Sequence, residues 1–260
     1  MGEPITGDHV HFGGQETRIK KGISYYWDLR SPSYFSLASD EERRAWRDCL
    51  RALHDGAGLR VLDVGTGRGF LASLLAEDGH WVTGLDLSSG MLSLAAASRQ
   101  DALNLAFCRG DAERLPFRGA SFDLLVSRHL LWTLPDPAQA VAEWSRVLRS
   151  GGRLAAVDGM WFDDAPVMQL RRLISSILTS IKERRDPRIF DRHYRNIRGH
   201  LPLYNHDNPE RVVDLFRGAG LQNVRLSDLE EIDRAQRRQG GLRYRLSNKR
   251  PVFLVTGDKL

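Results

Sequence analysis

From residue 60 onward, short apolar runs alternate with helical patterns, and this alternation restricts the fold more than any other feature of the chain. Five runs predict strands: RVLDV at 60–64, WVTGLD at 81–86, LAFCR at 105–109, FDLLVS at 122–127 and GRLAAVD at 152–158. Helical patterns cover 68–78, 88–98 and 137–149. Runs that are apolar almost throughout are typical of parallel strands covered on both faces. We therefore expect an α/β, doubly wound sheet with right-handed crossovers.

The helix expected at 137–149 has the clearest boundaries. Asp136 can cap its amino end, and Pro137 stands at the first helical position, where a missing N–H costs nothing. Gly151 and Gly152 are expected to end the helix.

After the fifth strand the alternation stops. Residues 160–205 form an insert with one apolar helical stripe, which is either a helix packed on the core or a lid near the carboxyl ends of the strands. A helix near 208–219 and strands near 221–228 and at 251–257 end the chain. The expected organisation is an N-terminal helical or cap segment at 1–55 and one domain at 56–260 that includes the lid insert.

The charge of the chain does not by itself indicate nucleic acid. The net charge is +5, but 33 of the 38 basic residues are arginine and acidic residues are interleaved with them through most of the chain. The exception is the segment from Arg234 to Arg250, which has seven basic residues and no acidic one. That segment is either a solvated face or a contact surface.

Two features that the sequence lacks narrow the class of protein further. The sequence has no run of about 18 apolar residues and no apolar stretch at its amino end, which predicts neither a membrane span nor a secretory signal and favours the cytoplasm. Cys49 and Cys108 have no ligand spacing, so neither a disulfide framework nor a cysteine metal site is expected.

A glycine-rich loop follows the first strand in the sequence Val61-Leu-Asp-Val-Gly-Thr-Gly-Arg-Gly-Phe70. Gly65, Gly67 and Gly69 allow a tight turn and the close approach of a ligand at the start of the next helix. Asp86 ends the second strand 21 residues after Gly65, where a carboxylate can accept hydrogen bonds from both ribose hydroxyls.

These two features suit NAD as well as other adenosine cofactors. The dinucleotide pattern is G-x-G-x-x-G, whereas this loop reads G-x-G-x-G. Asp63 lies two residues before the first glycine, where it disfavours a pyrophosphate and attracts an ammonium group. The loop therefore favours a ligand with a ribose and a cationic end.

With these motifs the chain resembles the class I S-adenosylmethionine-dependent methyltransferases. The resemblance rests on LDVGTGRG, GLDLSSGML at 84–92, GDAERLPF at 110–117, SFDLLVSRHLLWTLPD at 121–136 and RVLRSGGRL at 146–154, and it covers about 60 to 158. The resemblance is greatest to the small-molecule branch of the family, which includes the methyltransferases of ubiquinone and menaquinone biosynthesis and of natural-product pathways. The resemblance implies a Rossmann-like sheet of seven strands with the last one antiparallel.

The resemblance also implies roles for individual residues. Gly65, Thr66 and Gly67 would line the methionine part of S-adenosylmethionine, with Asp63 near its amino group. Asp86 would hold the ribose, and Leu87 and Met91 would pack on the ribose and adenine. Asp111 and Ala112 would recognise the adenine edge, and Ser127 and Arg128 would pass beneath the sulfonium.

The acceptor side is expected to draw on the N-terminal segment and the insert. The stretch from Tyr25, Tyr26 and Trp27 to Tyr34 resembles the family's leading segment, which folds over the cofactor, or it is a helix whose aromatics fill the core. His129 follows the fourth strand, where it is either a general base or a residue that shapes the pocket. Trp132 is expected to form a pocket wall, and Asp158 either faces the pocket or caps a loop.

A partly apolar small molecule is the expected partner, and Arg188, Arg192 and Arg195 suggest that it carries an anionic group. The scattered His193, His200 and His206 predict no metal. The alternatives are an RNA or protein methyltransferase that uses 234–250, an NAD-dependent oxidoreductase, and a cofactor-binding protein without transferase activity. A membrane partner is not expected, nucleic acid is disfavoured, and a homodimer or higher homo-oligomer remains open.

Overall fold

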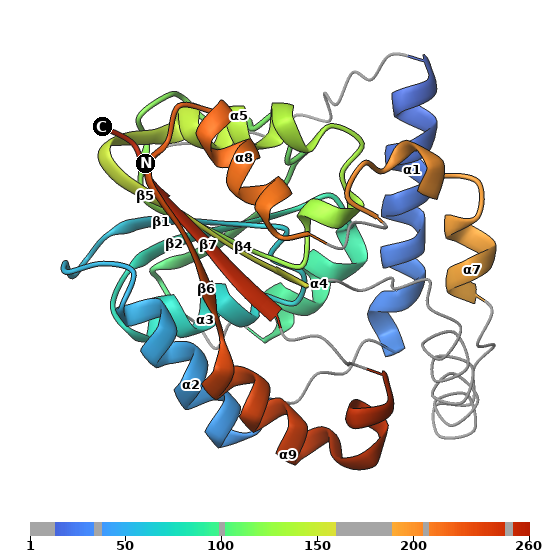
Figure 1. Ribbon diagram of the computed structural model, residues 1–260, viewed down its shortest axis with the longest axis horizontal. Coiled ribbons are helices and arrows are strands. Elements are labelled where there is room, and N and C mark those ends of the chain that lie inside the picture. The colour runs from blue at the N-terminus through green and yellow to red at the C-terminus, as the bar shows by residue number, and fades with distance from the viewer. Residues whose placement is uncertain (1–13, 34–37, 99–101, 160–188, 205–207, 248–251) are drawn as a thin grey trace.

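The computed structural model describes residues 14–33, 38–98, 102–159, 189–204, 208–247 and 252–260 (Figure 1). Within them, seven strands form one sheet in the order β3-β2-β1-β4-β5-β7-β6. The strands are β1 Arg60–Val64, β2 Trp81–Asp86, β3 Leu105–Arg109, β4 Phe122–Arg128, β5 Leu148–Gly159, β6 Gln222–Asp228 and β7 Val252–Asp258. β7 runs antiparallel to both β5 and β6. The predicted doubly wound sheet with an antiparallel last strand is confirmed.

Helices cover both faces of this sheet (Figure 1). The helices of the described residues are α1 Gly14–Arg30, α2 Asp40–Arg51, α3 Phe70–Glu77, α4 Ser89–Ala97, α5 Pro137–Val147, α7 Ile189–Tyr194, α8 Glu210–Gly218 and α9 Glu230–Ser247. Short 3-10 turns stand at Ser31–Ser33, Leu131–Thr133 and Arg198–His200. The predicted caps of α5 are present: the Asp136 side chain accepts from the Gln139 N–H at 2.9 Å, and Pro137 is the first helical residue.

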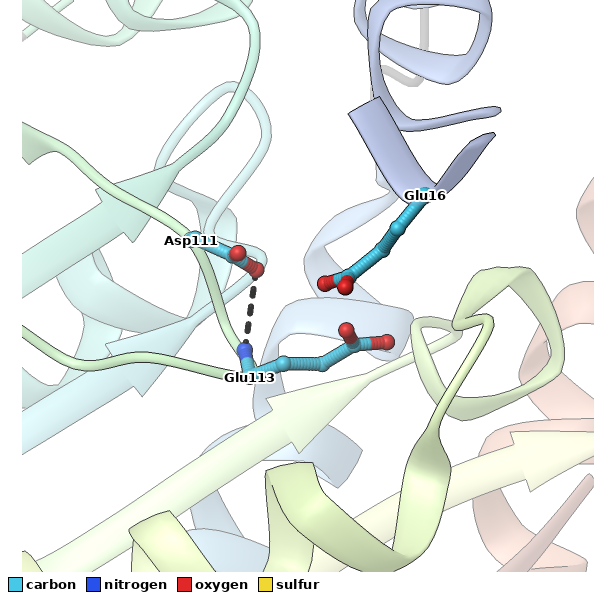
Figure 2. A group of neighbouring side chains, drawn as sticks. All are labelled: Glu16, Asp111 and Glu113. Carbon is cyan, nitrogen blue, oxygen red and sulfur yellow. Dashed lines mark hydrogen bonds between the residues drawn. The ribbon is translucent and has the colours of Figure 1, made fainter. Parts of the chain in front are cut away.

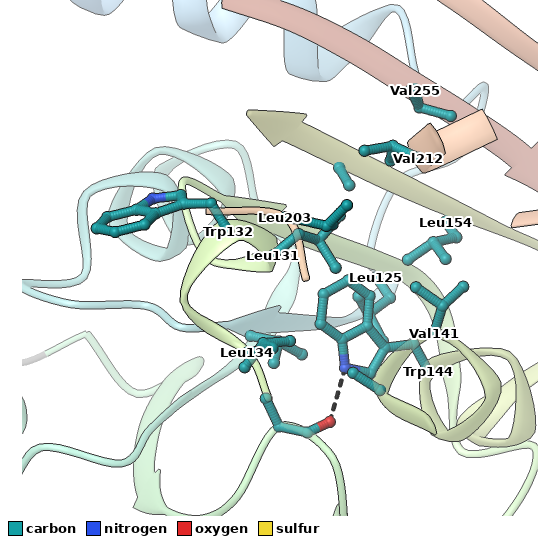
Figure 3. Close-up of a cluster of buried hydrophobic side chains, with 14 of the residues drawn as sticks. Leu125, Leu131, Trp132, Leu134, Val141, Trp144, Leu154, Leu203, Val212 and Val255 are labelled. Atoms are coloured by element: carbon teal, nitrogen blue, oxygen red, sulfur yellow. Dashed lines mark hydrogen bonds between the residues drawn. The ribbon is translucent and has the colours of Figure 1, made fainter. Parts of the chain in front are cut away.

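The core divides into two apolar clusters, one on each face of the sheet. Successive residues of one strand belong to different clusters, because their side chains point to opposite faces of the sheet. In β4, Leu125 joins the cluster under α5 and α8, whereas Leu124 joins the one under α2 and α3. In the first cluster, the Trp144 indole donates to the Ala112 carbonyl at 2.9 Å (Figure 3). This bond ties α5 to the loop after β3.

The N-terminal helix α1 packs beside α7 at one end of the sheet (Figure 1). Tyr26 is 5% exposed, and its ring meets Phe190 and Tyr194 edge-on at 5.5 and 5.2 Å. Of the two interpretations of the aromatic stretch, Tyr26 therefore follows the one in which it fills the core. The insert is described only at 189–204, and its remaining residues lie outside the described part of the chain.

One expectation about an element was wrong. Helix α5 ends at Val147 and the chain enters β5 at Leu148, so Gly151 and Gly152 lie inside a strand. There the register with β4 shifts between Phe122 and Leu124, because the glycine pair forms an irregularity that bonds to Lys259. No expectation concerned the secondary structure of the basic segment, whose residues up to Ser247 belong to α9.

Candidate cofactor site

Three glycines with left-handed backbones form the loop after β1. The φ angles of Gly65, Gly67 and Gly69 are 71, 55 and 77°. A Cβ at Gly65 would lie 2.8 Å from Leu130, and one at Gly69 would lie 2.9 Å from Phe107. A Cβ at Gly67 would meet nothing within 4 Å. The outer two glycines thus permit close packing, whereas Gly67 presents bare backbone to open space.

Asp63 lies beneath this loop near the end of β1 and is 2% exposed. Its Oδ2 accepts from the Thr66 hydroxyl at 2.6 Å and from the Ala72 N–H at 3.2 Å. Burial raises the pKa of Asp63 to about 6, although these hydrogen bonds and the Arg128 guanidinium oppose the rise. At neutral pH the carboxylate is mostly ionised and can attract a cationic group.

Asp86 ends β2 and links the glycine loop to the start of α4. Its Oδ2 accepts from the Gly67 N–H at 2.8 Å, and its Oδ1 accepts from the Ser88 N–H at 2.9 Å. Burial raises the pKa of Asp86. Each carboxylate oxygen can accept a second hydrogen bond. The side chain can therefore also hold a pair of hydroxyls.

Asp111 follows β3 and belongs to a group of three carboxylates that also includes Glu16 and Glu113 (Figure 2). The cation between them is the ammonium of Lys20, which lies 2.6 Å from Glu16 and 2.7 Å from Asp111 and also pairs with Glu113. Although burial opposes the charge, hydrogen bonds to all three carboxylates raise the pKa of Lys20. An ammonium group thus takes the place that a metal ion would need.

One cavity of about 940 Å³ joins these features. Among the residues that line it are ten of the eleven expected at the cofactor: Asp63, Gly65, Thr66, Gly67, Asp86, Leu87, Met91, Asp111, Ala112 and Arg128. Ser127 lies outside the lining, because its hydroxyl donates to the Val64 carbonyl at 2.9 Å and joins β4 to β1. This position indicates that Ser127 has a structural role beneath the site.

Arg128 and His129 lie at the carboxyl end of β4, and their side chains have different surroundings. The Arg128 guanidinium stacks over Phe70, 4.7 Å from the ring centroid, and over Trp46 at 5.3 Å. His129 has a left-handed φ of 59°, and its N–H donates to the Val157 carbonyl at 2.8 Å. Burial and the nearby Arg128 charge lower the pKa of His129 well below its usual value, so the ring is neutral.

The residues expected on the acceptor side divide into two groups. Trp27 and Trp132 line the cavity with His129, whereas the buried Tyr26 and the 60% exposed Tyr25 do not. Asp158 lies outside the lining as well. Its Oδ2 accepts from the Trp132 N–H at 3.3 Å, as a loop-capping aspartate does. Tyr34 falls outside the described residues.

The two described arginines among those expected to bind an anionic acceptor do not line this cavity. Arg192 and Arg195 are exposed and absent from its lining, and Arg188 lies outside the described residues. The sequence interpretation also missed Lys20 and Ser24 of α1, which do line it. The available signal was a polar residue at every fourth position of a predicted helical segment, one face of a helix.

The described part of the chain offers no helix that is both long and apolar enough to span a bilayer. Residues 62–156 match a family model described as a methyltransferase domain. Demethylmenaquinone methyltransferase from Beutenbergia cavernae is 40% identical over 137 residues, which make up 52% of this chain and 54% of the relative. The chain thus spans about half the length of such curated relatives.

Solved structures share the fold over most of the chain. The 4+2 cyclase SpnF superposes with a TM-score of 0.62 at 18% identity, covering 91% of this chain and 94% of that one. Phosphoethanolamine N-methyltransferase 2 of Haemonchus contortus, in complex with S-adenosyl-L-methionine, has a TM-score of 0.59 at 18% identity, covering 94% and 57%. Residues 62–156, which include the central strands, thus match a methyltransferase domain, and the chain shares the fold of these solved structures.

Proposed function

We propose that the protein transfers a methyl group from S-adenosylmethionine to a small-molecule acceptor. One observation carries this proposal: Asp63, Asp86 and Asp111 line a single cavity around the bare backbone of Gly67. Three carboxylates suit a ligand that presents an ammonium, two hydroxyls and an aromatic amine, and they repel a pyrophosphate. The family match over 62–156 supports the same cofactor.

The residues present fit the cofactor part by part. Asp63 would receive the amino group of the methionine part, and Asp86 the ribose hydroxyls. Asp111 would accept from the exocyclic amine of adenine. Leu87, Met91 and Ala112 supply apolar surface between the ribose and adenine positions. These assignments follow the family resemblance, and the cavity lining supports them.

The bound cofactor supplies an electrophilic methyl group on a sulfonium, and the chain has to orient it and exclude water. Fixed geometry alone can provide much of the acceleration of an in-line displacement. His129 lines the cavity and is neutral, so its ring could accept a proton. Its lowered pKa makes it a weak base, which favours a role in shaping the pocket.

Trp27, Leu130, Trp132 and Leu134 also line the cavity. These apolar side chains support a flat, apolar acceptor. The relatives named demethylmenaquinone methyltransferases point the same way, toward an aromatic ring such as a quinol. The cytoplasmic location and a homo-oligomeric state stay predictions.

The nucleic-acid alternative depends on the basic segment, and three of its arginines already form ion pairs. Arg234 lies 2.8 Å from Glu231, Arg237 lies 2.6 Å from Asp233, and Arg238 pairs with Glu41 of α2. Phosphate binding needs basic groups that are available to phosphate. These ion pairs therefore favour a solvated, structural role for this part of α9.

Calorimetric titration with S-adenosylhomocysteine and with NADH tests the cofactor. We expect micromolar binding of the former and none of the latter, and tight NADH binding alone would refute the proposal. Turnover of S-adenosylmethionine is then measured with a demethylnaphthoquinol and with short RNA. Methylation of RNA only would overturn the small-molecule acceptor. Binding without turnover on any acceptor, in a fold that the cyclase SpnF also adopts, would indicate a different chemistry.

A further inference from the structure

One face of α1 carries a polar residue at every fourth position. These residues are Glu16, Lys20, Ser24 and Asp28. Side chains four residues apart lie along one side of a helix, so the four can contact the same neighbouring surface. That surface consists of the two loops that follow β2 and β3, which carry the expected adenosine contacts.

The second half of this face holds the start of α4. The Ser24 hydroxyl donates to the Leu87 carbonyl at 3.2 Å. The Asp28 carboxylate accepts from the Ser88 hydroxyl at 2.7 Å and from the Gly90 N–H at 2.8 Å. α1 is therefore bonded directly to the segment after Asp86.

The first half of the face holds Asp111. The Lys20 ammonium donates to Asp111 Oδ2 at 2.7 Å, and Asp111 Oδ1 accepts from the Glu113 N–H at 3.0 Å. The side chains of Lys20, Asp111 and Glu113 are 2, 5 and 1% exposed. Two donors on opposite oxygens fix the orientation of the carboxylate, while the cavity lies beside it.

The charge balance depends on Lys20. One oxygen each from Glu16, Asp111 and Glu113 lies within 4.8 Å of the others, and Arg114 also approaches Glu16 at 3.4 Å. Without the ammonium, three neighbouring carboxylates would repel one another, and Asp111 would lose one of the two donors that fix its orientation. A displaced Asp111 carboxylate would no longer present an acceptor to the exocyclic amine of adenine.

We propose that Lys20 is a positioning residue that orients the Asp111 carboxylate and balances the charge around it, and that it thereby sets the preference of the site for adenine. The inference rests on the proposed function, because it takes the bound ligand to be an adenosine cofactor. It adds a residue from outside the sheet to the recognition of the base.

The test compares two ligands that differ only at the base. S-adenosylhomocysteine presents an amine to Asp111, whereas its inosine analogue presents a carbonyl oxygen. The full chain should prefer the adenine ligand by at least about a hundredfold, since a site built to pair with one group rejects a ligand that lacks it. Lys20→Met should reduce that preference to below about tenfold, mainly through weaker binding of the adenine ligand.

Lys21→Met is the matched control, because Lys21 is the next residue of α1 and is exposed. It should leave both affinities within twofold. If Lys20→Met does not fold, Lys20→Gln gives the same readout, since its amide retains donors but no charge. An unchanged adenine preference in the folded variant refutes the role of Lys20, whereas failure of the parent chain to bind S-adenosylhomocysteine refutes the proposed function instead.

Discussion

The Asp86 carboxylate accepts the Gly67 N–H at 2.8 Å, and this bond joins the end of β2 to the glycine loop after β1. The same carboxylate lines the cavity, where the proposed ribose would lie. One side chain therefore both shapes the loop and faces the ligand. Its removal should affect binding more than stability.

We expect Asp86→Asn to weaken S-adenosylhomocysteine binding by at least about tenfold, because hydrogen bonds to a charged group contribute about 1.5–3 kcal/mol each. Calorimetry at neutral pH measures the loss. Asp214→Asn, on the exposed face of α8, is the control and should change the affinity less than twofold. Equal effects of the two substitutions would contradict the assignment of Asp86 to the ligand.

Binding of S-adenosylhomocysteine should strengthen as the pH rises from 5 to 7. Burial raises the pKa of Asp63 to about 6 from 3.8, so the carboxylate becomes ionised, and attracts the ligand's ammonium, only as the pH passes through that value. Because the unfolded carboxyl ionises first, the contribution of Asp63 to stability falls as the pH rises from about 4 to 6 and stays lower above pH 6. Affinities measured at four pH values should show the rise, and Asp63→Asn should flatten most of it.

Alanine substitutions at Gly65 and Gly67 should have different effects, the first mainly on stability and the second mainly on ligand affinity. Both need a left-handed backbone, which costs an alanine about 1–2 kcal/mol. At Gly65 the new methyl would also collide with Leu130, adding about 1–3 kcal/mol. Gly67→Ala should therefore keep most of the stability in urea unfolding but lose at least about tenfold in ligand affinity. A Gly67→Ala protein that binds normally would show that the ligand does not approach there.

Trp144→Phe should destabilise the protein by about 1–3 kcal/mol, because it leaves the buried Ala112 carbonyl without its indole donor. Figure 3 shows this bond within the cluster under α5. Trp81→Phe is the control, since Trp81 is 60% exposed and the change should cost no more than about 0.5 kcal/mol. Urea unfolding distinguishes the two. Equal losses would mean that the bond adds nothing to stability.

His129→Asn tests the two roles of that histidine, and asparagine tolerates the left-handed backbone found there. We expect kcat to fall less than tenfold, with a larger change in the acceptor KM, because the lowered pKa makes His129 a weak base. Kinetics with any acceptor that supports turnover provides the measurement. A fall in kcat of a hundredfold or more at unchanged cofactor affinity would instead identify a general base.

Local patterns in the sequence determined most of the fold. The five central strands were predicted within a few residues, because continuous apolar runs and the glycines after them act through short-range geometry. The same holds for Asp63 and Asp86, which parallel strands bring together whenever each stands at a strand end. The predicted end of α5 was wrong because Leu148 and the glycine pair belong to β5, which pairs with β4 and β7.

Only the tertiary structure decided which residues share the site. Lys20 and Asp111 are 91 positions apart, and nothing local to either predicts their 2.7 Å contact. The adjacent Tyr25 and Tyr26 also differ, because only one face of α1 is buried: Tyr26 lies in the core and Tyr25 is exposed. Sequence periodicity tells which face of an element is apolar, but the partner of that face depends on how the whole chain packs. The sequence thus determined the sheet and its cofactor loops, whereas packing of α1 determined what surrounds them.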